Sequence, residues 1–260
     1  ATPRDVWFLG VMSLICLAVT GHLAFRTYGP SGFAGDVWRK GCRQCHVQWW
    51  EEFWSWRHEG AALDGEDLSL VHRTPPPGME WEWAHAESST DWWNASRDLL
   101  HSVIEQRVDA SDGPLLQIGC GDSPLPGLLH SAGFRDVDHI DISPQVVSLM
   151  RRRYSGPSWE GMRFEVRDFM ASPSAGGGAP PPAHKFSAVI DKAGIWDWLQ
   201  DEAPSALRRL LAAVQRALKT EGVYIVVTKQ PPSELQQSLT QTAASFIVEE
   251  SHLLQGGQAW

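Results

Sequence analysis

One nine-residue stretch, LLQIGCGDS at 115–123, constrains the fold of this 260-residue chain more than any other. An apolar strand-like run enters a Gly-x-Gly turn, and a second strand-like run ends at Asp141, twenty residues after Gly121. A strand, a glycine turn, a helix and a second strand with an acidic residue at its tip form the nucleoside-binding half of a Rossmann-like fold. The glycines let a ligand approach the backbone, and the carboxylate suits two ribose hydroxyls.

The residue at position 124 bears on which nucleoside fits the turn. A dinucleotide fingerprint places its third glycine there, beside a pyrophosphate held at a helix N-terminus. This chain has Pro124 instead. A ligand without phosphates, such as S-adenosylmethionine, does not need that glycine, so the turn favours S-adenosylmethionine over NAD.

Strand and helix patterns alternate along the C-terminal part of the chain. This alternation predicts an α/β fold with a Rossmann-like, doubly wound, mostly parallel sheet. The expected strands are 115–118, 137–142, 162–166, 186–190, 223–228 and 245–249, and the expected helices are 91–108, 124–132, 143–154, 206–218 and 233–242. The Gly/Pro-rich stretch 172–182 is expected to form a loop.

Charge and composition limit the partners. The formal net charge of −9 argues against a nucleic-acid-binding protein, and the run Arg151 to Arg153 is expected to be a solvated helix face. The chain has 14 tryptophans, eight of them within 49–93. Aromatic-rich surfaces favour interfaces and membrane boundaries, which suggests protein partners in a membrane complex.

The segment 6–25 contains no charged side chain. Twenty residues give about 30 Å of helix, the thickness of a bilayer's hydrocarbon core. A secretory signal peptide is the alternative, but the run exceeds a typical apolar signal region and no A-x-A cleavage site follows. The pattern therefore predicts an N-terminal transmembrane helix acting as a single-pass anchor. Within it, His22 is expected to meet water or a neighbouring helix rather than haem or chlorophyll.

Basic residues near this segment predict its orientation. One arginine, offset by an aspartate, precedes the span, and four basic residues follow it. The positive-inside rule then places the large C-terminal part on the cytosolic, matrix or stromal side, with an organellar membrane suspected. We expect an anchor over 1–28, a Trp-rich helical linker and N-terminal cap over 29–108, and the α/β domain over 109–260.

Cys42, Cys45 and His46 match the C-x-x-C-H pattern of covalent haem attachment. Such haems are attached on the membrane side opposite to the one inferred, so a c-type haem is not favoured. A zinc site with a distant ligand such as His58 is another reading, without a second C-x-x-C to support it. A structural or incidental role ranks first, and no metal is expected.

Four motifs together resemble a known family. They are IGCGDS at 118–123, GFRD at 133–136, IDISP at 140–144 and VIDK at 189–192. In order and spacing, 49–254 resembles the class I (seven-stranded) S-adenosylmethionine-dependent methyltransferases. Within these it looks most like the branch of the elongation-factor-1-alpha lysine methyltransferases and the endothelin-converting-enzyme-2-like methyltransferases. The aromatic stretch 49–56 resembles that branch's N-terminal element more loosely.

The resemblance implies a role for each matching position. Gly119 and Gly121 would pass under the methionine part of S-adenosylmethionine, Asp141 would bind the ribose, and Asp168 would face the adenine amino group. Cys120 and Ile142 complete the expected cofactor-binding set. Asp191 and Lys192 would line the edge of the methyl-transfer pocket, with Asp191 a candidate acceptor for the proton lost by an amine.

Two departures from the family pattern carry expectations of their own. The stretch AGIWD at 193–197 replaces the usual Gly-Thr-Leu-Asp, which would put Trp196 in or beside the pocket. Little chain follows the sixth expected strand, so the sheet is expected to lack the seventh.

Two hypotheses follow: a membrane-anchored methyltransferase that acts on a protein side chain such as lysine, or a non-catalytic methyltransferase-like subunit of a photosynthetic or respiratory membrane complex.

Overall fold

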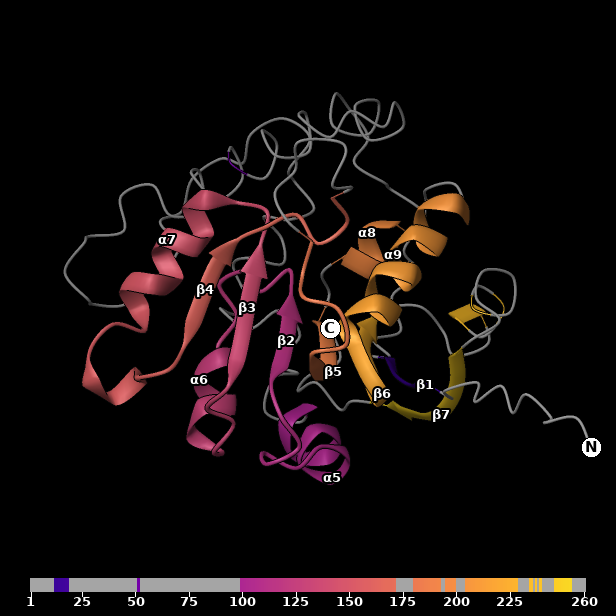
Figure 1. The fold of residues 1–260 in the computed structure, drawn as a ribbon, viewed down its shortest axis with the longest axis horizontal. Helices are drawn as coiled ribbons and strands as arrows, with labels where there is room; N and C mark the ends of the chain where they lie inside the picture. Colours follow the sequence, from indigo (N-terminus) through magenta and orange to yellow (C-terminus); the bar gives the residue numbers. More distant parts are fainter. Residues whose placement is uncertain are drawn as a thin grey trace, which may run out of the picture.

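A computed structural model describes residues 12–18, 51, 99–171, 180–192, 195–199, 204–228, 234, 235, 237, 239 and 246–253. These residues form a seven-stranded sheet whose neighbouring strands all run parallel, in the order β4-β3-β2-β5-β6-β1-β7 (Figure 1). The strands are β1 (Met12–Ala18), β2 (Leu115–Ile118), β3 (Val137–Asp141), β4 (Arg163–Val166), β5 (Phe186–Lys192), β6 (Leu218–Thr228) and β7 (Phe246–Leu253).

Helices connect the strands as a doubly wound fold requires. They are the π-helical turn η2 (Leu100–Ile104), α5 (Glu105–Arg107), α6 (Leu125–Ser131), α7 (Pro144–Arg153), the 3₁₀ turn η3 (Pro157–Trp159), α8 (Ile195–Leu199) and α9 (Pro204–Ala217). The expected α/β class with a parallel, Rossmann-like sheet is confirmed. The short helix α8 was not expected.

Hydrophobic side chains cover both faces of the sheet. On one face, Leu210 and Val214 of α9 belong to a core cluster that includes Val189 of β5. On the other, Leu129 of α6 belongs to a second cluster that includes Ile190. Successive β5 residues thus serve opposite layers, as expected for a parallel strand buried on both sides.

Strand β6 begins at Leu218, before the expected 223–228, and its pairing with β5 is irregular in this first part. Leu218 pairs with Phe186, and regular pairing resumes only where Val223 meets Ala188. Glu221, between the two paired stretches, has a positive φ of 61°. Because side chains in an irregular stretch do not alternate between the two faces, the alternating sequence pattern did not predict the first residues of β6.

Strand β1 lies within the segment expected to cross a membrane. It pairs with β6 on one side and β7 on the other, so the described sheet has seven strands. A parallel strand from the N-terminal part of the chain thus lies between β6 and β7, and the described residues hold no seventh strand after β7, as expected. An apolar run without charges suits a strand buried on both faces as well as a transmembrane helix. Within the described ranges, no helix has both the length and the apolar character needed to span a bilayer.

The expected anchor over 1–28 is therefore described only at Met12–Ala18, which is extended rather than helical. Most of that segment, and nearly all of the expected linker over 29–108, lies outside the described residues. The division into three parts, the membrane side and the organelle stay predictions.

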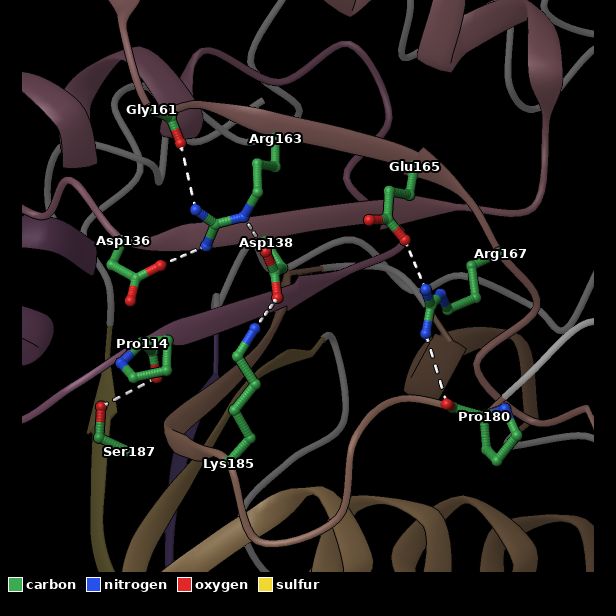
Figure 2. A network of polar contacts seen from close by, with 10 residues as sticks. All are labelled: Pro114, Asp136, Asp138, Gly161, Arg163, Glu165, Arg167, Pro180, Lys185 and Ser187. Carbon is green, nitrogen blue, oxygen red and sulfur yellow. Dashed lines mark hydrogen bonds and ion pairs between the residues drawn. The ribbon is translucent and has the colours of Figure 1, made fainter.

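Ion pairs tie the amino ends of the strands together (Figure 2). Lys185, just before β5, donates to Asp138 Oδ2 on β3 at 2.7 Å, and Arg163 of β4 donates to Oδ1 of the same carboxylate and to Asp136. Burial raises the pKa of Asp138, but the bonds from Lys185 and Arg163 outweigh it and hold that pKa below its usual range. This network links β3, β4 and β5 at their amino ends.

A buried polar pair joins the central strands. His139 of β3 and Gln117 of β2 are each 1% exposed, and His139 Nδ1 lies 2.9 Å from Gln117 Oε1. The imidazole stacks on Phe164 with ring centroids 4.8 Å apart. Burial lowers the pKa of His139 to about 3, so the ring is neutral and Nδ1 donates to the amide oxygen.

Candidate functional site

The predicted cofactor residues gather where the strands end. Strand register places Ile118 level with Ile140 on one side and with Asp191 on the other. The chain passes from β2 outward to β3 and β4 and later returns to β5 on the opposite side of β2. The order in which the chain adds strands therefore reverses between β2 and β5 (Figure 1). In open α/β sheets, ligands bind at the carboxyl ends of the strands beside such a switch point.

The Gly-x-Gly turn after β2 requires both glycines. Gly119 has a φ of 59° and Gly121 a φ of 52°, in the left-handed region that side chains with a Cβ disfavour. Between them, the Cys120 N–H donates to the Ile140 carbonyl at 3.1 Å. The turn is thus tied to β3, and its backbone is bare where a ligand could approach.

Asp141 closes this turn from the tip of β3. Its Oδ2 accepts from the Gly121 N–H at 3.0 Å, and its Oδ1 accepts from the Ser143 N–H at 3.0 Å. Burial raises the pKa of Asp141 to about 6, the N–H donors of Ser143, Gly121 and Ile142 oppose this, and the nearby Glu51 carboxylate adds to it. The predicted ribose residue is therefore joined directly to the predicted glycine turn.

Ser143 begins α7 immediately after this carboxylate. Its φ of −87° and ψ of 117° are extended, and its hydroxyl accepts from the Val146 N–H at 3.4 Å, as an N-cap does. Pro144 occupies the first helical turn, where its missing N–H costs no hydrogen bond. The IDISP motif therefore encodes the tip of β3, its acidic residue and the start of α7.

Glu51 reaches the same place from a distant part of the sequence. Ser143 Oγ donates to Glu51 Oε1 across 92 residues, and the Gln145 N–H donates to the same oxygen at 3.5 Å. The sequence reading did not select Glu51. Its aromatic surroundings resembled an N-terminal element of the family, but no spacing rule connects this glutamate to the IDISP motif.

The basic run on α7 also contributes to the turn. Arg153 donates to the Asp122 carbonyl at 2.6 Å, and the Nε of Arg151 donates to the Phe164 carbonyl at 2.9 Å. Only Arg152 contacts its own helix alone, through Ser148. Arg151 and Arg152 are exposed, as expected for a solvated face, and Arg153 is half-buried. Arg151 and Arg153 in addition hold the backbone of a neighbouring strand and loop.

Asp168 lies beyond β4, beside the end of β3. The Arg167 N–H donates to the Asp141 carbonyl at 2.8 Å, which brings the two strand ends together. Asp168 Oδ1 accepts from the Met170 N–H at 2.9 Å, so the carboxylate stabilises the turn that follows the strand. The structure thus brings the expected adenine-facing residue to the same sheet edge as Asp141.

Cys120 and Ile142 belong to the turn and to the tip of β3. Cys120 is 2% exposed, and burial followed by the charge of Asp141 raises the pKa of its thiol well above the usual value. The thiol is therefore neutral. Ile142 is half-buried beside Asp141.

Asp191 and Lys192 end β5 on the other side of the switch point. Asp191 is fully buried, and its Oδ2 accepts from the Trp196 N–H at 2.8 Å and from the Tyr224 hydroxyl at 3.1 Å. Lys192 is 7% exposed. The Asp191 carboxylate thus links β5 to α8 and β6, and Tyr224 is a partner that the sequence reading missed.

Trp196 is buried, and its N–H reaches Asp191, which was expected at the edge of the pocket. Its side chain is 1% exposed and belongs to the core cluster under α9, with its ring centroid 6.5 Å from that of Tyr224. The tryptophan side chain therefore fills the core between α9 and the sheet. Cys42, Cys45, His46 and His22 lie outside the described residues.

Comparison with known proteins finds no matching family model but clear sequence relatives. The eEF1A lysine and N-terminal methyltransferase of Danio rerio is 31% identical over 146 residues, which are 55% of this chain and 19% of that protein. The EEF1A lysine methyltransferase 4 of Bos taurus is 26% identical over 217 residues, covering 78% of this chain and 69% of that protein. The chain is thus similar in sequence to the eEF1A lysine methyltransferases.

The methyltransferase resemblance inferred from the four motifs is thereby confirmed. The chain spans about a fifth of the length of the first relatives, such as the Danio rerio protein at 19%. Among solved structures, geranyl diphosphate C-methyltransferase from Streptomyces coelicolor A3(2) matches with a TM-score of 0.45 and 16% identity, over 85% of this chain and 77% of that one. An S-adenosylmethionine-dependent methyltransferase from Mesorhizobium loti matches with a TM-score of 0.37 and 19% identity, over 54% of this chain and 53% of that one.

Proposed function

We propose that this methyltransferase domain binds S-adenosylmethionine at the carboxyl edge of β2, β3 and β4 and transfers its methyl group to a protein side chain. The observation that carries the proposal is the Asp141 carboxylate, which accepts from the Gly121 N–H beside the switch point of the sheet. An acidic residue at this position suits the two hydroxyls of a ribose.

The residues present fit the nucleoside. An ionised carboxylate offers about four acceptor positions. The Gly121, Ser143 and Ile142 N–H groups use three of those of Asp141, which leaves an acceptor position for a ribose hydroxyl. Gly119 and Gly121 present backbone without a Cβ, and Asp168 stands at the end of the next strand for the adenine amino group. Cys120 and Ile142 would complete the contact surface.

The chemistry asks little of the protein beyond alignment. S-adenosylmethionine supplies a methyl group on a positively charged sulfur, so the leaving group is already activated and the protein contributes proximity and orientation. Asp191 accepts two hydrogen bonds in the core, from Trp196 and Tyr224. Its proposed part is therefore to hold the end of β5, and with it Lys192, in place at the edge of the pocket.

The proposed methyl acceptor is a lysine side chain of a protein. Support comes from the relatives, whose names specify lysine residues of eEF1A. An amine must lose its proton before it attacks, so a site for lysine must favour the neutral amine. A carboxylate or a carbonyl at the pocket edge would receive that proton.

The first test is binding of S-adenosylhomocysteine, measured by calorimetry with the full chain at pH 7.5. Asp141→Asn keeps the shape of the side chain but removes its charge, and we expect the dissociation constant to rise by at least about tenfold. Glu160→Gln, which removes a charge at an exposed position, is the matched control and should leave binding unchanged. Wild-type protein that binds no ligand at millimolar concentration would refute the proposal.

The second test is methyl transfer to purified eEF1A, with lysine methylation read by mass spectrometry. Methylation by wild-type protein that is lost in Asp141→Asn would support the enzyme. Ligand binding without transfer to any protein substrate would favour the alternative, a non-catalytic methyltransferase-like subunit of an organellar membrane complex. The tryptophan-rich stretch 49–93 and the apolar segment 6–25 motivate that alternative.

A further inference from the structure

Gly127 is the third residue of α6, the helix that begins directly after the glycine turn. Inside a helix glycine is less favourable than alanine, because it loses more backbone freedom on folding. Backbone geometry does not call for glycine here, since the described glycines with a positive φ lie at other positions, such as Gly119 and Gly121. The reason for glycine at 127 therefore lies in the space around it.

The side chain of Tyr154 fills that space. A Cβ at position 127 would lie 2.9 Å from Cε1 and 3.0 Å from the hydroxyl oxygen of Tyr154. Nonbonded carbon atoms normally approach to about 3.5–4.0 Å, so a methyl group at 127 would overlap the tyrosine ring. Gly127 and Tyr154 thus form a close contact between the backbone of α6 and the C-cap residue of α7.

The ring of Tyr154 cannot move aside without breaking other contacts. It stacks on Phe164 of β4 with ring centroids 5.7 Å apart and planes 7° apart, and it meets Trp159 of η3 edge-on at 5.0 Å. Burial raises the pKa of its hydroxyl, and the charge of Arg153 and hydrogen bonds from the Gly127 N–H and Arg153 oppose this rise. The tyrosine is therefore held by β4, by η3 and by the start of α6 at once.

This contact lies next to the backbone of the glycine turn. Ser123 Oγ accepts from the Leu125 N–H at 3.2 Å, so a hydrogen bond joins the end of the turn to the start of α6. Earlier in the turn, the Gly121 N–H donates to Asp141 Oδ2 at 3.0 Å. A shift of α6 away from Tyr154 would therefore pull on the same stretch of backbone that Asp141 holds.

We propose that Tyr154 is a positioning residue for the cofactor, because its ring, packed against Gly127, sets the distance between α6 and the end of α7 and thereby the place of the Gly-x-Gly turn. This inference rests on the proposed function, which puts S-adenosylmethionine beside that turn. A turn that is in its binding geometry for only part of the time raises the apparent dissociation constant in proportion. Ligand affinity should therefore depend on the space at position 127.

The first test compares Gly127→Ala with Ser148→Ala in the full chain. Alanine is the better helix former, so Gly127→Ala would favour α6 if the position were free. With Tyr154 in place, the added methyl group must displace the helix or the ring. Calorimetry at pH 7.5 should then show a dissociation constant of S-adenosylhomocysteine about tenfold above that of wild type. Ser148 is exposed on α7 and contacts Arg152 of the same helix, so Ser148→Ala should bind like wild type.

Hydrogen exchange separates a local effect on the turn from a general loss of stability. In the absence of ligand, Gly127→Ala should exchange faster than wild type in peptides that contain 119–124, while peptides of β5 exchange as in wild type. Equal acceleration in both regions would mean that the substitution only destabilises the fold, and it would overturn the positioning role.

A second substitution relieves the overlap. Leucine at 154 is apolar but lacks the three atoms nearest to position 127, which are Cε1, Cζ and the hydroxyl oxygen. Tyr154→Leu alone should raise the dissociation constant about fivefold, because the turn loses its support. If the two residues act through one contact, Gly127→Ala added to Tyr154→Leu should cost less than about twofold further. A full tenfold further loss would show that residue 127 acts by another route.

The outcomes separate this inference from the proposed function. Wild-type affinity in Gly127→Ala or in Tyr154→Leu would overturn the positioning role and leave the methyltransferase proposal intact. Should Gly127→Ala alone fail to fold, the double variant decides. Folding with the affinity of Tyr154→Leu supports the contact, and failure to fold overturns it. If wild-type protein binds no S-adenosylhomocysteine, the proposed function fails and the positioning role fails with it.

Discussion

Asp141 is buried, which opposes its ionisation, and in the proposed function its ionised form accepts from a ribose. Its pKa is raised to about 6, so the carboxyl is largely protonated at pH 5 and largely ionised at pH 7. Only the ionised form offers all its oxygens as acceptors. Ligand affinity should therefore depend on pH in a window where a normal aspartate does not titrate.

We predict that the dissociation constant of S-adenosylhomocysteine is about tenfold higher at pH 5 than at pH 7. The factor follows from the ionised fraction of a group with a pKa of about 6. Calorimetric titrations at both pH values measure it. Asp141→Asn should bind weakly at both, and a wild-type affinity that is constant across the window would contradict the assignment of Asp141.

His139 makes a second residue-scale prediction, about stability. Its pKa of about 3 in the folded protein lies below the usual 6.5, so the unfolded chain binds a proton first as the pH falls. The contribution is complete above pH 6.5 and is lost as the pH falls toward 3. Between pH 7 and 4.5 the loss is about 2–3 kcal/mol.

The matched variant for this prediction is His139→Gln, whose amide can still donate to Gln117 but does not titrate. Asp141 shifts stability the other way, because its raised pKa favours the folded protein as the pH falls through 6. The difference between wild type and His139→Gln in urea unfolding at the two pH values is therefore the quantity to measure. A difference that does not change with pH would mean that His139 is not buried and neutral.

At the scale of elements, the glycine turn is held from two sides. Asp141 of β3 accepts from the N–H of Gly121, and Arg153 at the end of α7 donates to the Asp122 carbonyl at 2.6 Å. The helix α7 that begins beside Asp141 thus also supports the glycine turn from its other end. Sequence spacing assigned Gly121 and Asp141 to one site without their contact, and it assigned Arg153 to a solvated helix face.

We predict that Arg153→Met weakens S-adenosylhomocysteine binding about fivefold to tenfold while the fold remains intact, because the turn loses its charged donor. Arg152→Met is the matched control, since Arg152 donates only to Ser148 on its own helix. Calorimetry with circular dichroism of both variants measures binding and folding separately. Equal affinity in the two variants would show that the Arg153 contact does not shape the site.

Across the whole molecule, the two ends of the parallel strands have different roles. The carboxyl ends of the strands carry the candidate site, and their amino ends carry the Asp138 network with Arg163 and Lys185. Register between parallel strands has to be fixed somewhere, because their connections are long and the strands are apolar on both faces. Ion pairs at the amino ends of the strands fix this register at a distance from the candidate site.

We predict that Asp138→Asn lowers the free energy of unfolding by about 1–3 kcal/mol at pH 7, because Lys185 loses its charged partner in a half-buried site. The folded-state pKa of Asp138 is lowered, so its contribution is present above the unfolded value and is lost as the pH falls through the folded one. The wild-type advantage in urea unfolding should shrink in acid, and ligand affinity at pH 7 should stay within about twofold of wild type. An affinity that falls as far as stability would place the network in the site.

Most of this architecture could be predicted from local sequence patterns. The strand at Leu115–Ile118, the left-handed glycines and Asp141 follow from spacing and backbone preferences that act over a few residues. Contacts between distant segments were not accessible in this way. Glu51 meets Ser143 across 92 residues, and Tyr224 meets Asp191 across 33, and no periodicity marks either pair.

The apolar segment around β1 shows a different limit. The twenty residues of 6–25 carry no charge, which suits a membrane helix, and the seven residues of β1 within them suit a strand of a parallel sheet as well, because both environments favour apolar side chains. Burial of Trp196 was missed for a related reason. An aromatic residue near a pocket motif is compatible with the pocket or with the core, and the choice depends on where α8 turns.

Under the proposed function, the raised pKa of Asp141 also makes ligand binding release protons. Near pH 6 part of the protein population carries a proton on this carboxyl, and a ligand whose hydroxyls donate to the anion must expel it. The released protons are taken up by the buffer. Calorimetric heats at pH 6 should therefore differ between buffers of different ionisation enthalpy while affinities agree, and Asp141→Asn should abolish that difference.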